Sequence, residues 1–414
     1  MERIHFIGIG GVGMNGLAQL AAQSGFEVTG SDRAYSPDAE IFQGLENLGI
    51  IISDQDGSGI TENTNAVVFS TAIESNNPDL QQSRSLNIPL LHRSIFLKEL
   101  VGDGELIAVA GTAGKTTTTG LLGWIFESLG KDPSVYNGAS VLNWKTPSTP
   151  GNVRKGSSSL WIIEADESDK SFLAFHPTHT IITNIFKDHY ELDELHALFD
   201  QFECQTSGIT IRGPVAANID LTVPMLGKHN HENARCAEAL CAKLGLDMGL
   251  VRDAIAQFKG IERRLEIAGE AGGATVLDDY AHNPAKIEAS LSAVAEAYGT
   301  VHAFWRPHGF TPLFQGMDEL VKAFSLHWNK NGGSIMILPV YYAGGTVDRK
   351  TSSEELVARL NARDVPALLV PDYTILKTEL EQRAKPGEAI LGMGARDPEL
   401  PLFAKRLVAE WKMP

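Results

Sequence analysis

Short apolar runs alternate with helix-like segments along almost the whole chain of 414 residues. Strands that alternate with helices are typical of parallel α/β sheets, so the pattern predicts this fold class. No repeat of fixed period and no low-complexity tract interrupts it. The expected strands lie near residues 4–7, 27–30, 66–69, 88–91, 160–163, 180–183, 274–278, 301–305, 334–338, 367–370 and 389–391.

A glycine-rich turn connects the apolar run at 106–110 to a helical pattern that ends at Leu129. Glycines let backbone N–H groups line a concave loop, Lys115 supplies a charge for terminal phosphates, and the Thr116 hydroxyl suits a magnesium ion. The motif is shorter than usual, because Val109 occupies the place of the first glycine. The alternative is a strand-turn-helix with a solvated lysine. The predicted nucleotide-phosphate residues are Gly111, Thr112, Gly114, Lys115, Thr116 and Thr117.

A second glycine motif lies at the amino terminus, between the strand-like residues 4–7 and a helical pattern over 14–24. Gly8, Gly10 and Gly13 have the G-x-G-x-x-G spacing, and Asp32 ends the next strand about 20 residues on, where an acid can meet a ribose or base hydroxyl. The motif indicates a dinucleotide or a nucleotide-sugar diphosphate. The alternative is a tight turn in a domain without a ligand.

Two changes of pattern divide the chain into three predicted domains. Val101-Gly102-Asp103-Gly104 is typical of a linker, and a third alternating unit starts near Gly260. We expect a Rossmann-like domain at 1–103, a central domain with a phosphate-loop ATPase sheet at 104–259, and a Rossmann-like domain at 260–414.

Composition narrows the classes of partner. A net charge of −16 argues against general nucleic-acid affinity, so local cations and helix N-termini must attract an anionic substrate. Three cysteines without C-x-x-C spacing indicate a reducing compartment and neither a disulfide framework nor a zinc site. No apolar stretch has membrane-spanning length, and the first residues lack the core of a signal peptide. We expect a soluble cytoplasmic protein.

Polar clusters follow several predicted strands. Glu164 begins an acidic run, Glu164–Asp169, where a carboxylate near a phosphate loop suits magnesium, although a solvated acidic loop is the commoner reading. Asp188 and His189 follow another strand, where an imidazole can ligate a metal or steer a phosphate. Residues 134–159, rich in Ser, Gly, Pro and Asn, are expected to form a long loop.

The last two clusters lie on either side of residue 260. His229 and Asn233 are four apart in a helical pattern over 229–244, so they share a face and could meet one flat ligand. Arg263-Arg264 precede an apolar strand that ends in Asp278–Pro284, and either arginine could neutralise a transferring phosphoryl group.

Together these motifs resemble the Mur ligases, the ATP-dependent amide-forming enzymes of peptidoglycan synthesis, and in particular the branch that adds L-alanine to UDP-N-acetylmuramate. The resemblance follows family order over nearly the whole chain. The matching stretches are His5–Met14, Ser70–Ile73 with Asn77-Pro78, Ala108–Thr119, Glu164–Asp169 with Ser171-Phe172, Thr183–Ile185 with Asp188-His189, Gly227–Asn233, Arg263-Arg264 and Asp278–Pro284.

The resemblance implies a reaction in two steps. The muramyl carboxylate attacks the γ-phosphate of ATP to give an acyl phosphate, and the amine of the amino acid then displaces phosphate. The implied catalytic residues are Lys115, Glu164, His189 and Arg264, with Thr116 and Glu164 on one magnesium ion and His189 on the other. The partners would be UDP-N-acetylmuramate and an amino acid or short peptide, with no nucleic acid or membrane, in a monomer or homodimer.

The resemblance also implies where each substrate binds. The first domain would hold the diphosphate on Gly10, Gly11, Val12 and Gly13, with Asp32 near the uridine. His229 and Asn233 would hold the adenine, and Asp279 and Arg264 would reach the ribose and phosphates. The remaining implied substrate contacts are Ser70, His282, Arg306 and His308.

The chain departs from the alanine-adding branch at four places. Ala113 replaces a histidine of the phosphate loop, and the chain between Phe199 and Met225 is shorter than usual. In that branch, two arginines help to bind the amino acid. This chain has Gly309 and Pro312 in their places, and Arg306 could substitute for one of them.

These departures leave alternatives open. A recycling ligase that attaches a murein tripeptide to the same sugar nucleotide needs a wider acceptor pocket, which loss of two arginines could provide. A non-catalytic nucleotide-binding paralogue would explain Ala113 and the short middle, but Lys115, Thr116, Glu164 and His189 are all present. A dehydrogenase is the weakest reading, because it leaves the phosphate loop unexplained.

Overall fold

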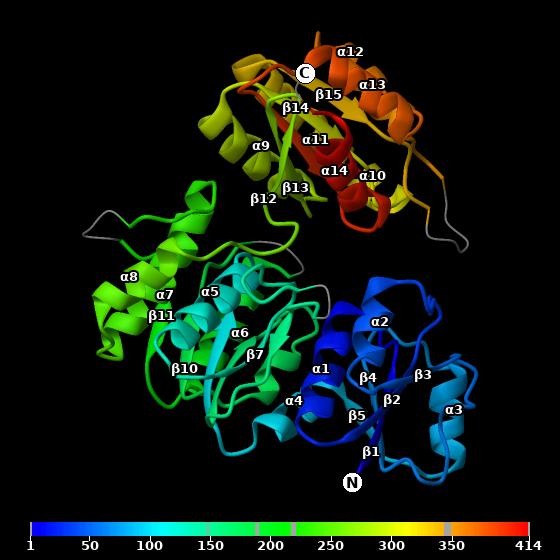
Figure 1. Cartoon of the computed structure of the whole chain (residues 1–414), viewed down its shortest axis with the longest axis vertical. Coiled ribbons are helices and arrows are strands. Elements are labelled where there is room, and N and C mark those ends of the chain that lie inside the picture. The colour runs from blue at the N-terminus through cyan, green and yellow to red at the C-terminus, as the bar shows by residue number, and fades with distance from the viewer. Residues whose placement is uncertain (1, 147–148, 187–189, 217–220, 343–348, 413–414) are drawn as a thin grey trace. The chain divides into compact units, whose positions relative to one another are not determined.

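The computed structural model of the chain describes residues 2–146, 149–186, 190–216, 221–342 and 349–412. They form two compact units (Figure 1), one of Met1–Pro224 with His229–Ile261 and one of Met225–Lys228 with Glu262–Pro414. Parallel pairing dominates the three sheets of these described residues, which confirms the predicted α/β class. The exact boundaries 1–103, 104–259 and 260–414 stay a prediction.

The first sheet belongs to the first unit and is fully parallel, in the order β3-β2-β1-β4-β5. Ile4 and Phe6 pack with helices α1 and α4 on one face, whereas Ile7 and Val67 pack with Leu80 of α3 on the other. Its elements are β1 (Arg3–Ile7), α1 (Val12–Gln23), β2 (Glu27–Ser31), α2 (Glu40–Glu46), β3 (Ile51–Ser53), β4 (Ala66–Phe69), α3 (Pro78–Ser85), β5 (Leu90–His92) and α4 (Arg93–Val101).

The second sheet has the order β11-β10-β6-β9-β7-β8 and is parallel except for the β7–β8 pair. Its central strands are almost entirely buried, so they read as continuous apolar runs in the sequence. Its elements are β6 (Glu105–Ala110), α5 (Lys115–Ser128), β7 (Ser134–Tyr136), β8 (Val153–Arg154), β9 (Leu160–Glu164), the 3-10 helix η1 (Ser171–Ala174), β10 (His179–Ile182), α6 (Leu192–Cys204), β11 (Thr210–Arg212), α7 (Lys228–Lys243) and α8 (Met248–Ala256).

The expectation of one long loop over 134–159 is wrong in part. The structure places β7 and β8 inside this segment, and β7 pairs with β9 in parallel. Both strands are short, and turn-forming residues surround them, so a local pattern cannot reveal them. Their position depends on the hydrogen bonds that the neighbouring strand supplies.

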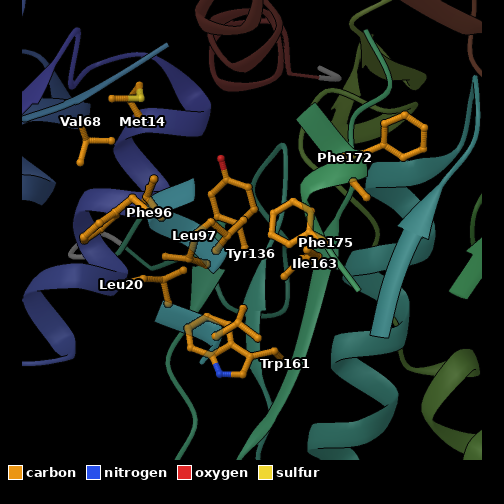
Figure 2. Packing of buried hydrophobic residues seen from close by; sticks show 14 of the residues in the cluster. Met14, Leu20, Val68, Phe96, Leu97, Tyr136, Trp161, Ile163, Phe172 and Phe175 are labelled. Atoms are coloured by element: carbon orange, nitrogen blue, oxygen red, sulfur yellow. The ribbon is translucent and has the colours of Figure 1, made fainter. Parts of the chain in front are cut away.

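The first two sheets share one hydrophobic core. Figure 2 shows side chains of α1 and α4, among them Leu20 and Leu97, in the same cluster as Tyr136 and Trp161 of the second sheet. Buried polar groups join the same elements, because the Gln19 amide donates to Asn152 Oδ1 at 3.0 Å. The first two predicted domains therefore pack as a single unit.

The second unit contains a sheet of order β12-β13-β17-β14-β15-β16, with β12 antiparallel at one edge. Helices α9, α11 and α12 pack on one face, and α13 and α14 pack on the other. Its elements are β12 (Glu266–Ala271), β13 (Ala274–Asp279), α9 (Pro284–Tyr298), β14 (Val301–Trp305), α10 (Phe310–Gln315), α11 (Met317–Asn331), β15 (Ser334–Ile337), α12 (Ser353–Asn361), β16 (Ala367–Leu369), α13 (Tyr373–Arg383), β17 (Ala389–Met393) and α14 (Glu399–Glu410).

None of the helices in the described ranges combines the length and the apolar character needed to cross a membrane. The long segments that the sequence predicts as helices are amphipathic or lie between sheet and solvent, as α/β packing requires.

A buried histidine makes the stability of the second unit depend on pH. Burial lowers the pKa of His327, on α11, to about 4, and its Nε2 atom has no hydrogen-bond partner among the described residues. The unfolded chain, whose histidine has the ordinary pKa of about 6.5, therefore binds more protons between these two pKa values. The free energy of unfolding should fall by up to about 1.4 kcal/mol per pH unit as pH drops below 6.5.

His327→Leu should remove this share of the acid sensitivity. Urea denaturation at about pH 7 and about pH 5 measures the difference, which should be smaller in the variant than in the parent chain. His196→Leu, at an exposed position of α6, is the control and should keep the parental pH dependence. Equal pH dependence in parent and His327→Leu would contradict the assignment.

Candidate active site

Three neighbouring strands of the second sheet end at the same edge and place the phosphate loop (residues 111–117) beside two polar segments. Val109 of β6 pairs with Glu164 of β9, and Ala110 pairs with Ile182 of β10. Because all three strands are parallel, Glu164 and the residues after Ile182 flank the loop. Ligands bind at this carboxyl edge in open α/β sheets.

The loop is held in shape by backbone conformation and by Asn184. Gly111 and Gly114 have φ values of 125° and 85°, which only glycine adopts readily. The Asn184 amide donates to the carbonyl of Ala113 at 2.8 Å, and its oxygen accepts from the N–H of Ala113 at 2.9 Å. The Ala113 side chain is exposed and takes no part, so the loop keeps its shape without a histidine there.

Lys115 occupies the interior of the phosphate loop. Its Nζ donates to the Gly111 carbonyl at 2.8 Å and to Glu167 at 2.7 Å, and Asp166 lies 3.8 Å away. Burial opposes the charged form, but the carboxylates of Glu167, Asp166 and Glu164 together outweigh it and raise the pKa of Lys115. The lysine is therefore a cation whose charge is balanced by the acidic loop (residues 164–169) until a more anionic ligand arrives.

Thr116 and Glu164 form a second polar pair beside this lysine. The Thr116 hydroxyl donates to Glu164 Oε1 at 3.0 Å, and the N–H of Gly138 donates to Oε2 at 2.7 Å. Burial raises the pKa of Glu164, although the Lys115 charge and these two hydrogen bonds favour its ionised form. Hard oxygen ligands of this kind fit Mg²⁺, which keeps several waters or phosphate oxygens. The described residues contain no group of three His, Cys, Asp or Glu side chains that would form a protein-only metal cage.

Helices α1 and α5 both begin at a glycine without a side-chain cap. Their N-cap residues are Gly11 and Gly114, and neither makes a side-chain hydrogen bond to the first turn. The first N–H groups of these helices therefore remain available to an anion, whereas α3 uses the Asn77 side chain as its cap.

The two helix-borne candidates for the adenine lie on α7. Asn233 is buried against the phosphate loop, because a Cβ added at Gly114 would lie 2.2 Å from its Oδ1. His229 is exposed one turn earlier on the same helix. His189 lies outside the described residues.

The first sheet brings its predicted residues to its own carboxyl edge. The glycine loop (residues 8–13) follows β1, Asp32 follows β2 and Ser70 follows β4. Asp32 accepts the N–H of Gly10 and the N–H of Ala34, each at 2.8 Å, so its carboxylate also holds the loop. The structure brings these candidates together, and their contacts with a ligand stay a prediction.

The two edges of the first unit are joined by Tyr136 and Arg93. The Tyr136 hydroxyl donates to the carbonyl of Gly13 at 3.0 Å, although Tyr136 belongs to the second sheet. Arg93, the first residue of α4, donates to Asp169 of the acidic loop at 3.2 Å. Tyr136 thus links the glycine loop to the second sheet, and Arg93 links α4 of the first sheet to the acidic loop, all within one unit.

The second unit places its candidates at the carboxyl edge of its own sheet. The Asp279 carboxylate accepts the N–H groups of Leu265 and Ala281 at 2.8 Å each, and burial raises its pKa. Arg264 lies over the ring of Tyr280 at 5.6 Å. These contacts hold the start of the unit together, so Asp279 has a structural task besides its predicted one.

His282 and His308 form a ring pair after β13 and β14, with centroids 5.0 Å apart. Burial, with the Lys286 charge, lowers the pKa of His282 to about 4, and burial with Arg396 lowers that of His308. Both imidazoles are therefore neutral near pH 7. Arg306 donates to Asp397 at 2.6 Å and lies over the rings of Tyr341 and Tyr373, so its charge is already balanced.

Several residues at these edges escaped the sequence reasoning. Glu167 binds Lys115 more closely than the other acids, and Gly138, Asn184 and Arg93 hold the neighbouring groups. The position of Asn184 directly after a predicted strand could have indicated its role. No local pattern indicates the roles of Gly138 and Arg93, because these roles depend on which strands are neighbours.

Comparisons with known proteins agree with this arrangement. Residues 3–104 match the profile "Mur ligase family, catalytic domain", residues 109–199 "Mur ligase middle domain" and residues 263–396 "Mur ligase, glutamate ligase domain". A UDP-N-acetylmuramate–L-alanine ligase from Rhizobium meliloti is 32% identical over 95% of this chain and 93% of its own length.

Solved structures show the same fold. A UDP-N-acetylmuramate–alanine ligase from Thermotoga maritima has a TM-score of 0.82 at 24% identity, with 99% of both chains covered. A murein peptide ligase from Psychrobacter arcticus has a TM-score of 0.68 at 22% identity, covering 99% of this chain and 98% of its own. With matches of this length and identity in sequence, and the same fold throughout, the chain belongs to the Mur ligase family.

Proposed function

We propose that the chain is an ATP-dependent ligase that joins L-alanine to the carboxylate of UDP-N-acetylmuramate and releases ADP and phosphate. The observation that carries the proposal is the meeting of Lys115, Thr116 and Glu164 at one sheet edge, in a chain similar over 95% of its length to a ligase of that name. Because ATP is a substrate, we assign the activity to the cytoplasm. We propose that the active protein is a monomer or a homodimer.

The phosphate loop supports ATP binding. The uncapped first turn of α5 offers N–H groups to the phosphates, and Lys115 can exchange Glu167 for a phosphate oxygen. Thr116 and Glu164 would hold Mg²⁺, which supplies electrostatic stabilisation of phosphate charge when it is bound. Asn233 and His229 are proposed to hold the adenine, and Thr112 and Thr117 complete the loop.

Charge balance explains why a divalent cation is needed. Glu164, Asp166, Glu167 and Asp169 carry four carboxyl groups, and the acidic loop is paired with only two cations in the described structure, Lys115 and Arg93. A polyphosphate that enters this edge would meet net negative charge. A bound cation would offset this repulsion, and it would also stabilise the ionised form of Glu164, whose pKa is raised mainly by burial.

The sugar nucleotide is proposed to bind the first sheet, with its diphosphate on Gly10–Gly13 and its uridine near Asp32 and Ser70. The amino acid is proposed to bind the second unit, near the neutral imidazoles of His282 and His308. Arg306 can contact the amino acid only if its guanidinium binds Asp397 and the ligand together, or if its hydrogen bond to Asp397 breaks. Arg264 and Asp279 are proposed to reach the ATP. Residues 1–103 are proposed as the UDP-sugar domain, 104–259 as the ATP and magnesium domain, and 260–414 as the amino-acid domain.

A murein tripeptide is the second candidate acceptor. Gly309, the N-cap of α10, and Pro312, within that helix, carry no cation, so two guanidinium groups of the alanine-adding branch are missing from the proposed acceptor side. A shared fold with a murein peptide ligase is compatible with this acceptor and does not select it. A non-catalytic paralogue is disfavoured, because Lys115, Thr116 and Glu164 are joined in one site.

Lys115→Ala tests the phosphate loop. Loss of the cation should lower ATP-dependent phosphate release by at least about 1,000-fold, since charge on the transferring group loses its fixed partner. Binding of UDP-N-acetylmuramate, measured by calorimetry, should stay nearly unchanged. Lys131→Ala, at an exposed position beyond the end of α5, is the matched control. Turnover retained in Lys115→Ala would refute the assignment.

Gly138→Ala tests the position of Glu164 without changing its charge. An added Cβ would lie 2.5 Å from the Glu164 Oε2, so the carboxylate must shift from the position in which it meets Thr116. A displacement of this size should lower kcat by about 100-fold and raise the Mg²⁺ concentration required.

The control for this variant is Gly44→Ala on α2, where the new Cβ meets nothing closer than 3.4 Å. It should behave like the parent. If Gly138→Ala keeps the parental kcat and Mg²⁺ dependence, the proposed metal-holding role of Glu164 is wrong.

The acceptor is identified by weighing products. Purified protein with ATP, Mg²⁺ and UDP-N-acetylmuramate is given single amino acids or the murein tripeptide, and products are analysed by mass spectrometry. We expect a product heavier by one alanine residue. A tripeptide product would select the second candidate, and nucleotide binding without any product would favour the paralogue.

A further inference from the structure

We propose that Arg93 is a substrate-binding residue whose guanidinium holds an anionic oxygen group of the sugar nucleotide between the glycine loop and the acidic loop. The inference rests on the proposed function, since that function supplies the ligand. The anionic group is either the diphosphate or the muramyl carboxylate, and the experiment below separates the two.

The position of Arg93 follows from the topology of the first sheet. It comes directly after β5 and begins α4, so it lies at the carboxyl edge that also carries the glycine loop. A Cβ added at Gly13 would lie 3.3 Å from the Arg93 Nη1, which places the guanidinium against the first turn of α1. That turn is where the uncapped N–H groups of α1 favour an anion.

The other side of the guanidinium faces the acidic loop. Nη2 donates to Asp169 at 3.2 Å and lies 4.0 Å from Asp166. Asp166 is also 3.8 Å from the Nζ of Lys115, so one carboxylate is flanked by both cations. Arg93 and Lys115 therefore lie on the two sides of the region in which a carboxylate of the sugar nucleotide would meet the γ-phosphate.

Burial makes a purely structural role costly. The Arg93 side chain is 22% exposed. Burial opposes its charge, but Tyr136, Asp169 and Asp166 outweigh this effect and raise the pKa of Arg93. Buried ion pairs often contribute little net stability, because the cost of desolvation cancels much of their attraction. Arg93 lies beside the uncapped start of α1. Its buried charge is better explained by an anionic ligand that binds the guanidinium together with Asp169.

Binding of three nucleotides to Arg93→Ala tests the proposal. UDP, UDP-N-acetylglucosamine and UDP-N-acetylmuramate are titrated by calorimetry, and we expect UDP-N-acetylmuramate to bind about ten- to a hundred-fold more weakly than in the parent. An equal loss for all three ligands would assign the diphosphate. A loss confined to UDP-N-acetylmuramate would assign its carboxylate.

Two further variants separate ligand contact from structural support. Arg93→Lys keeps the charge and should recover part of the affinity, as seen in KM for the sugar nucleotide, with KM for ATP unchanged. Asp169→Asn removes the partner but leaves the guanidinium, so it should bind the nucleotide at least as well as Arg93→Lys does. Arg3→Ala, which breaks a similar pair with Glu27 at the opposite edge of the sheet, is the control.

The proposal is overturned if Arg93→Ala binds UDP-N-acetylmuramate like the parent. It is also overturned if Asp169→Asn weakens this binding as much as Arg93→Ala does and both variants unfold at a lower temperature than the parent. In the second case the ion pair supports the fold and Arg93 does not meet the ligand. Failure of the proposed function looks different, because the parent chain itself would then not bind UDP-N-acetylmuramate.

Discussion

The Lys115 ammonium, buried among carboxylates at the edge of the second sheet, is the interaction on which the site depends. Without a ligand its charge is balanced by Glu167 at 2.7 Å and by the Gly111 carbonyl. In the proposed function, a phosphate replaces these partners of Lys115, and a cation offsets the charge of the displaced acids. The neighbouring carboxylates keep the lysine in its charged form, because together they outweigh the cost of burial and raise the pKa of Lys115.

The first two sheets act as one body because they share a core and a set of buried polar contacts. Tyr136 packs in that core and also donates to Gly13, so the carboxyl edges of the first two sheets are held at a fixed spacing. The proposed reaction between two bound substrates depends on such fixed positions, because proximity and orientation supply much of the rate. The second unit, by contrast, has its own sheet and its own core.

The departures from the family pattern have different physical weight. Ala113 costs the loop little, since Asn184 binds its backbone rather than its side chain. Gly309 and Pro312 change the charge at the acceptor side, and the neighbouring Arg306 is already paired with Asp397. Of these departures, the uncharged residues Gly309 and Pro312 therefore have the larger physical effect, because the phosphate loop keeps its shape with Ala113.

The sequence by itself determined the sheet class, the main strands, both glycine loops and the strand-end position of Glu164, because these depend on local pattern and on glycine geometry. The edge strands β3, β11 and β12 were missed, since the hydrogen bonds that define them come from neighbours. Only the tertiary structure decided that Glu167 binds Lys115 and that Gly138 holds Glu164. It also placed Arg93 between two loops. These contacts depend on strand order and on packing between sheets, and the spacing of residues along the chain determines neither of them.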